Sequence, residues 1–114
     1  MSDNQFDQDI IYRSRWMAAL VREAVANHPV VVVTGARQVG KSTLLGHELP
    51  SKQWRYVTLD HFDNLRQAQE APEALWAGTT HIIIDEVQKA PGVLSAIKRA
   101  VDERGRRIRF VLSG

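Results

Sequence analysis

The chain has 114 residues, of which 44% are hydrophobic and 25% are charged, a composition that suits one small globular domain and excludes an intrinsically disordered chain. Its formal net charge is +2 at pH 7, a bias too small to indicate a nucleic-acid-binding protein by itself. Because the sequence contains no cysteine, it excludes disulfides and metal sites built from thiolates.

The N-terminal segment is acidic and polar, so we expect residues 1–13 to be a solvated lead-in and residues 14–114 to form the domain. It lacks the basic start and apolar stretch of a signal peptide. The longest purely apolar run, Val30 to Val33, is far shorter than the roughly 20 residues needed to cross a bilayer. We therefore expect a cytoplasmic protein with no membrane partner.

The first element that the pattern predicts is an amphipathic helix. It begins after Ser14, a candidate N-cap, and ends near Asn27, because Pro29 disfavours helix in the residue before it. The apolar residues at helical spacing favour packing in the core over a ligand site: Trp16, Met17, Leu20, Val21, Ala24 and Val25.

A phosphate-binding loop follows a short β-branched strand, Pro29 to Thr34. The spacing is G-x-x-x-x-G-K-S, directly before helix-favouring residues, which is the context that this motif requires. Glycines let successive backbone N–H groups face the phosphates, Lys41 adds a positive charge, and the Ser42 hydroxyl can ligate Mg²⁺. The predicted nucleotide-binding residues are Gly35, Ala36, Arg37, Gln38, Val39, Gly40, Lys41, Ser42 and Thr43.

The middle of the chain predicts a second strand over Tyr56 to Leu59 and a polar helix over Asn64 to Glu70. Between them, Asp60 is interpreted as a helix N-cap in preference to a distant metal or water ligand. A further short helix begins at Pro72 and ends at Gly78, since proline suits a first helical turn and glycine a helix end.

A third buried strand, His81 to Asp85, carries a pair of carboxylates at its end. Asp85 can bind Mg²⁺ directly or through water, and Glu86 can orient or deprotonate an attacking water. Standing alone, the pair would be interpreted as an exposed cap of the strand, but the upstream phosphate-binding loop favours the functional interpretation. No guanine-reading N/T-K-x-D motif occurs, and a water-activating Glu86 favours hydrolysis over phosphoryl transfer to a small molecule.

The last elements are a helix that begins at Pro91 and ends at Gly105, and a fourth strand, Ile108 to Leu112. Strands that alternate with helices predict a parallel sheet with ligands at its carboxyl end. Position alone leaves two interpretations of Ser113. Its side chain reaches the γ-phosphate or the attacking water, or it is an ordinary polar residue in a turn at the strand end. The helix is expected to bury Val93, Leu94, Ile97, Ala100 and Val101.

The remaining polar residues give weaker signals. Arginines around the last turn are more typical of a solvated surface than of a nucleic-acid contact. Arg37 and Gln38 are expected to face solvent or a neighbouring subunit, and the four histidines lack metal-ligand spacing. The arginines are Arg104, Arg106, Arg107 and Arg109, and the histidines are His28, His47, His61 and His81.

Four stretches together, GARQVGKSTLL, YVTLD, IIIDEVQKAP and RFVLSG, give the chain a recognisable pattern. From about Arg15 to the last residue it resembles the N-terminal ATPase domain of a prokaryotic AAA-type ATP-binding family whose members continue into a large C-terminal region of unknown function. The resemblance implies that residues 35–42 are the Walker A loop, that Asp85 and Glu86 are the Walker B pair, and that Ser113 is the sensor.

The same resemblance implies an α/β, three-layer P-loop NTPase fold with a parallel sheet in the order 5-1-4-3-2. Because the chain ends at Gly114, we expect a fold truncated after the fourth strand, without the fifth strand, the lid and any arginine finger. A truncated reading frame or fragment would hydrolyse ATP slowly, since losing an arginine finger costs roughly 10³- to 10⁵-fold in rate.

The sequence thus predicts Mg²⁺-dependent ATP hydrolysis. Lys41, Glu86 and Ser113 are the candidate catalytic residues, and Ser42 and Asp85 the candidate metal ligands. One alternative is a non-catalytic nucleotide-binding remnant or interaction module. Another is a nucleic-acid-stimulated ATPase that uses the arginines near the last turn. A homo-oligomer or a protein partner is left open.

Overall fold

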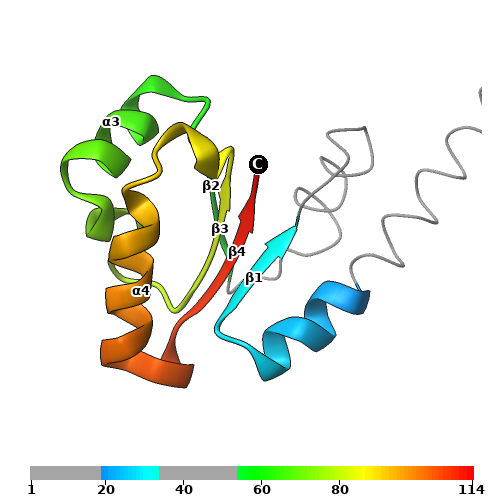
Figure 1. Ribbon diagram of the computed structural model, residues 1–114. Coiled ribbons are helices and arrows are strands. Elements are labelled where there is room, and N and C mark those ends of the chain that lie inside the picture. Colours follow the sequence, from blue (N-terminus) through cyan, green and yellow to red (C-terminus); the bar gives the residue numbers. More distant parts are fainter. Residues whose placement is uncertain (1–18, 34–53) are drawn as a thin grey trace, which may run out of the picture.

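The computed structural model describes residues 19–33 and 54–114, which contain a parallel sheet of four strands. In space the strands follow the order β1-β4-β3-β2 (Figure 1). This order confirms the α/β fold and the insertion of the fourth strand between the first and the third. The strands are β1 (Val30–Val33), β2 (Arg55–Thr58), β3 (His81–Asp85) and β4 (Arg109–Ser113).

The two central strands are buried on both faces. In β3, three consecutive isoleucines, Ile82 to Ile84, are fully buried, and in β4 the same holds for Phe110 and Val111. Such unbroken apolar runs are expected where helices cover both sides of a parallel sheet. The strand register pairs Ile83 of β3 with Val111 of β4.

Helices cover the sheet from two sides (Figure 1). On one side lie α3 and α4, and on the other lies a helical segment over residues 19–27. The result is the predicted three-layer arrangement. The helical elements on the first side are α3 (Phe62–Glu70), the 3-10 helices η2 (Pro72–Trp76), η3 (Val87–Lys89) and η4 (Gly105–Arg107), and α4 (Val93–Arg104).

Each side of the sheet has its own apolar cluster. The larger cluster, on the α4 side, packs Trp76 edge-on against Phe110, with ring centroids 5.0 Å apart. The smaller cluster joins the helical segment 19–27 to the sheet through Val21, Val33, Ile83 and Val111. Burial of these side chains is the main force that holds the layers together.

Three sequence predictions about burial and capping are wrong. Leu94 is 49% exposed and Leu20 is 46% exposed, whereas Ala96 is buried in place of Leu94. The buried residues of α4 are Val93, Ala96, Ile97 and Ala100, which follow one helical stripe at i, i+3, i+4 and i+7, and Leu94 lies beside this stripe. Asp60 does not cap α3, because His61 occupies the N-cap position and no side chain donates or accepts a capping hydrogen bond there.

Some predictions lie outside the described residues. They include Trp16 and Met17 of the first helix, His47, and the whole segment 35–43 proposed to bind phosphate. Within residues 19–33 and 54–114, no helix is long and apolar enough to cross a membrane.

Candidate functional site at the carboxyl end of the sheet

The candidate carboxylates lie where parallel strands end side by side. Asp85 ends β3 and Ser113 ends β4, and the Ser113 hydroxyl donates a 2.6 Å hydrogen bond to Asp85 Oδ1. Ser113 is also the register partner of Val33, the last residue of β1. The strand that leads into the G-x-x-x-x-G-K-S segment therefore ends directly beside the strand that carries Ser113.

Asp85 is held by donors from three directions. Besides Ser113, the backbone N–H of Glu86 donates to Oδ1 over 2.9 Å, and the Tyr56 hydroxyl donates to Oδ2 over 2.8 Å. Hydrogen bonds to a carboxylate favour its charged form and fix its orientation. The carboxylate of Asp85 is thus oriented by side chains from β2 and β4 and by the backbone N–H of the following residue, Glu86.

Tyr56 contributes the contact from the edge strand. Its side chain is 45% exposed, yet burial of the hydroxyl raises its pKa above the usual value, and the hydrogen bond to Asp85 raises it further. The hydroxyl consequently stays protonated and remains a donor across the physiological pH range.

Glu86 occupies an unusual backbone conformation. Its φ of 58° and ψ of 41° are left-handed, and it is the only non-glycine residue with a positive φ among the described residues. A side chain in this region costs on the order of 1–2 kcal/mol, and such strain gathers at functional sites. The turn changes the chain direction directly after Asp85, and Gln88 donates a 2.7 Å hydrogen bond to Glu86 Oε2.

Beside these carboxylates, Asp60 pairs with Lys89 across the ends of β2 and η3. The hydrogen bond that Lys89 donates to the Asp60 carboxylate is the main reason that the pKa of Lys89 is raised. Both side chains are largely exposed, so the pair adds little to stability. It nevertheless shows that Asp60 acts as an ion-pair partner and not as the predicted helix cap.

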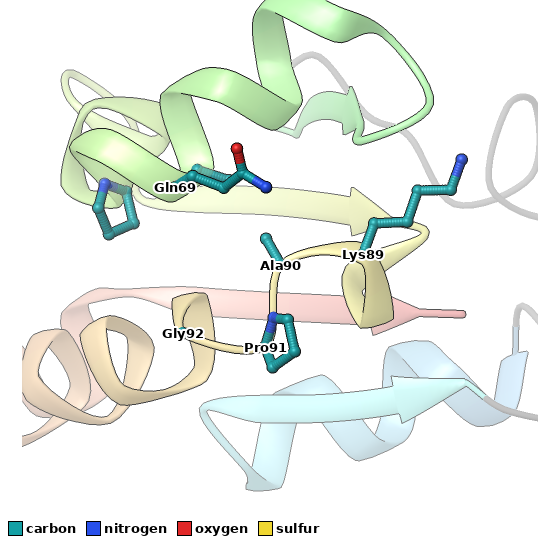
Figure 2. A pocket seen from close by; sticks show the side chains of 7 residues that line it. Gln69, Lys89, Ala90, Pro91 and Gly92 are labelled. Carbon is teal, nitrogen blue, oxygen red and sulfur yellow. The ribbon is translucent and has the colours of Figure 1, made fainter.

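An open pocket of about 280 Å³ lies between the end of α3 and the start of α4, on the side of η3 away from the helical segment 19–27 (Figure 2). Lys89 and the Ala90–Gly92 turn form one wall, and Gln69 faces them from α3. Neither Asp85 nor Glu86 lines it. The pocket is therefore separate from the carboxylate cluster.

At the opposite end of the sheet, His81 begins β3 and Arg109 begins β4. The rings of His81 and Trp54 pack edge-on, with centroids 5.0 Å apart. Burial is the main cause that lowers the pKa of His81, and the nearby positive charge of Arg109 lowers it further. Arg104 and Arg107 are exposed, whereas Arg109 is only partly exposed. Within the described residues, no group of three or more His, Cys, Asp or Glu side chains could hold a metal ion.

Sequence reasoning located Asp85, Glu86 and Ser113, which the structure brings together, but it missed Tyr56 and Gln88. Tyr56 pairs with Ile83 in the β2–β3 register, and alternate residues of a strand share a face, so Tyr56 lies on the face of Asp85. Knowledge of the strand order would have been enough to find it. Gln88 is only two residues from Glu86, yet its contact depends on the left-handed turn, which no local pattern indicates.

Comparison with known sequences agrees with this geometry. Residues 27–114 match a family model described as an AAA domain. The chain therefore belongs to the AAA domain family, and its general function is that of a nucleotide-binding AAA-type protein. No solved structure matches the chain.

Two curated relatives are uncharacterized proteins, one from Mycobacterium bovis and one from Mycobacterium tuberculosis, each 32% identical to the chain over 107 residues. The match covers 92% of this chain and 24% of each relative. The chain thus spans about a quarter of the length of these relatives.

Proposed function

We propose that the chain binds Mg-ATP and hydrolyses it at the carboxyl end of the sheet. The observation that carries the proposal is the strand register: β1, which runs into G-x-x-x-x-G-K-S, ends beside Ser113, and Ser113 contacts Asp85. The segment proposed to bind phosphate therefore follows β1 at the edge of the sheet where Asp85 and Ser113 lie, and this is the edge where open α/β sheets bind ligands.

The oxygen chemistry at this edge fits a magnesium ion. Mg²⁺ is usually bound through one or two carboxylates together with waters and substrate phosphates, and seldom by a dedicated cage of side chains. Asp85 supplies a carboxylate with a fixed orientation, and Ser42 would supply a hydroxyl. When bound, the ion neutralises charge on the β- and γ-phosphates.

The other residues have proposed roles in binding the phosphates, activating water and aligning Asp85. Backbone N–H groups of residues 35–43 and the Lys41 ammonium bind the phosphates. Glu86 accepts a proton from the attacking water or orients it. The Ser113 hydroxyl is fully buried and donates to Asp85, which supports a role in aligning that carboxylate. Sensing of the γ-phosphate by Ser113 is proposed from the family resemblance.

Binding is tested by thermal unfolding of the intact natural protein with and without Mg-ATP, alongside Lys41→Ala. At about 100 times Kd, the nucleotide adds about 2.7 kcal/mol to the free energy of unfolding. We expect the stabilisation in the parent and its loss in Lys41→Ala. If both proteins unfold cooperatively and ATP stabilises neither, the binding proposal is wrong.

Hydrolysis is tested separately, by the release of phosphate from ATP. The alternative, a non-catalytic nucleotide-binding module, predicts the thermal stabilisation without phosphate release. Phosphate release that is abolished in Lys41→Ala would support the ATPase.

A further inference from the structure

Gln88 occupies a position between the proposed general base and the end of β4. Its amide Nε2 donates a 2.7 Å hydrogen bond to Glu86 Oε2. A hydrogen bond to a charged acceptor is stronger than one between neutral groups, and it restricts where the carboxylate points. Gln88 is itself solvent-exposed, so this contact contributes more to orientation than to packing.

The backbone around this contact forms one turn. Glu86 is left-handed, and its carbonyl accepts a 3.1 Å hydrogen bond from the Lys89 N–H, which begins η3. The Ala90 N–H then bonds to the Val87 carbonyl over 3.2 Å. Because these bonds fix the backbone on either side of Gln88, they also fix the position of its Cα and Cβ atoms relative to Glu86.

The other side of the Gln88 amide faces Gly114, directly after the last residue of β4. A Cβ placed on Gly114 would overlap Gln88 Oε1 and lie 3.2 Å from Gln88 Cδ. A side chain at position 114 would therefore move the exposed Gln88 amide away from its present position. Since Ser113 beside it contacts Asp85, the end of β4 adjoins both carboxylates, one directly and one through Gln88.

We propose that Gln88 is a positioning residue that holds the Glu86 carboxylate for its work on the attacking water, and that the missing side chain at Gly114 leaves room for it. The proposal rests on the proposed ATPase function and adds the group that orients its base. It implies that a change at Gly114 reaches Glu86 through the Gln88 amide.

The test compares Gln88→Ala, Gly114→Ala and the double variant in the intact natural protein, with kcat and Mg-ATP affinity measured separately. We expect Gln88→Ala to lower kcat about tenfold, the cost of a lost charge-assisted hydrogen bond, while nucleotide affinity stays unchanged. Gly114→Ala should also lower kcat, and the double variant should be no slower than Gln88→Ala alone, because both changes act through the same contact.

A second readout does not depend on activity. Gly114→Ala and Gln88→Ala should both leave the unfolding midpoint close to that of the parent, because the exposed Gln88 side chain can move aside at little cost. A fall in kcat then reports the lost contact with Glu86 and not a loss of folding. Gln88→Glu, which keeps the size but replaces the donor by a like charge, should lower kcat at least as much as Gln88→Ala. An unchanged kcat in Gln88→Ala, or fully additive losses in the double variant, would overturn the proposal. Absence of hydrolysis in a parent that binds Mg-ATP would instead reject the ATPase function.

Discussion

The two faces of the sheet differ in what they bury and in what they carry. The α4 face packs against the larger apolar cluster, which includes Trp76, Ile84 and Phe110. The opposite face buries the smaller cluster around Ile83 and Val111. Since alternate residues of a strand point the same way, Asp85 and Ser113 belong to this second face.

Alternate residues of β3 therefore differ in role, because they lie on opposite faces of the sheet. In β3, Ile82 and Ile84 belong to the larger cluster, while Ile83 belongs to the smaller cluster on the face that Asp85 shares. Substitutions on the α4 face should therefore change the free energy of unfolding. Substitutions among the polar groups of the other face should change activity first.

The largest effect is expected for Glu86→Gln, which removes the proposed base without changing its size. We expect kcat to fall by roughly 10²- to 10⁴-fold, while the unfolding midpoint stays the same, as measured by phosphate release and thermal unfolding. Glu103→Gln on the exposed side of α4 is the matched control and should leave both quantities unchanged. A parallel loss of stability in Glu86→Gln would contradict the separation of the two faces.

The next largest effect is expected on the free energy of unfolding, for two neighbouring isoleucines of β3 that are equally buried but lie on opposite faces of the sheet. Ile84→Ala and Ile83→Ala should each lower the free energy of unfolding by about 2–5 kcal/mol. The loss for Ile84→Ala should be the greater, because the larger cluster leaves fewer ways for neighbours to fill the cavity. Denaturant unfolding measures both values, and a greater loss for Ile83→Ala would reverse the assignment of the main core.

A smaller effect is expected at the end of α4, the helix that covers the larger cluster. Gly105 has a φ of 59° and a ψ of −125°, a conformation that side chains rarely adopt. Gly105→Ala should cost about 1–3 kcal/mol in denaturant unfolding. Gly92→Ala, at a φ of −62° with open space around the added methyl group, is the control and should cost less than half as much.

The smallest effect concerns Tyr56→Phe, which removes one donor to Asp85. We expect a loss of about 0.5–1 kcal/mol at pH 8. The pKa of Tyr56 is raised in the folded protein, so its stabilising contribution is complete below the unfolded value of about 10 and is lost as the pH rises above it. Urea unfolding at pH 8 and pH 11 should therefore show parent and variant converging at the higher pH. A constant difference would reject the hydroxyl as the cause.

Some of the features on which these predictions depend could be predicted from the sequence, and others could not. The strands around His81–Asp85 and Val30–Val33 were predictable because a parallel sheet needs short, unbroken apolar runs, and Asp85 and Glu86 stood out because they end such a run. The strand order came from the family resemblance and not from the residues themselves.

What the sequence could not reveal are contacts that depend on three-dimensional packing. Leu94 was expected to be buried because its spacing fits a helical stripe, but the face of α4 that packs against the sheet is centred on Val93, Ala96, Ile97 and Ala100 and leaves Leu94 exposed. The ion pair of Asp60 and Lys89 joins residues from different elements. Such pairings follow from the tertiary arrangement, which local patterns do not encode.

The strand register also has a consequence for folding. β3 pairs with β2 and β4 across short separations, whereas Val30 of β1 pairs with Phe110, about 80 residues later, and this longer closure costs about 1 kcal/mol more in chain entropy. We expect β2, β3 and β4 to associate first and β1 to join last. At roughly 5–20 residues per second, the ribosome would leave the Val30–Val33 strand without its partner for about 4–16 s. During this interval the newly made strand is exposed to aggregation and to chaperones.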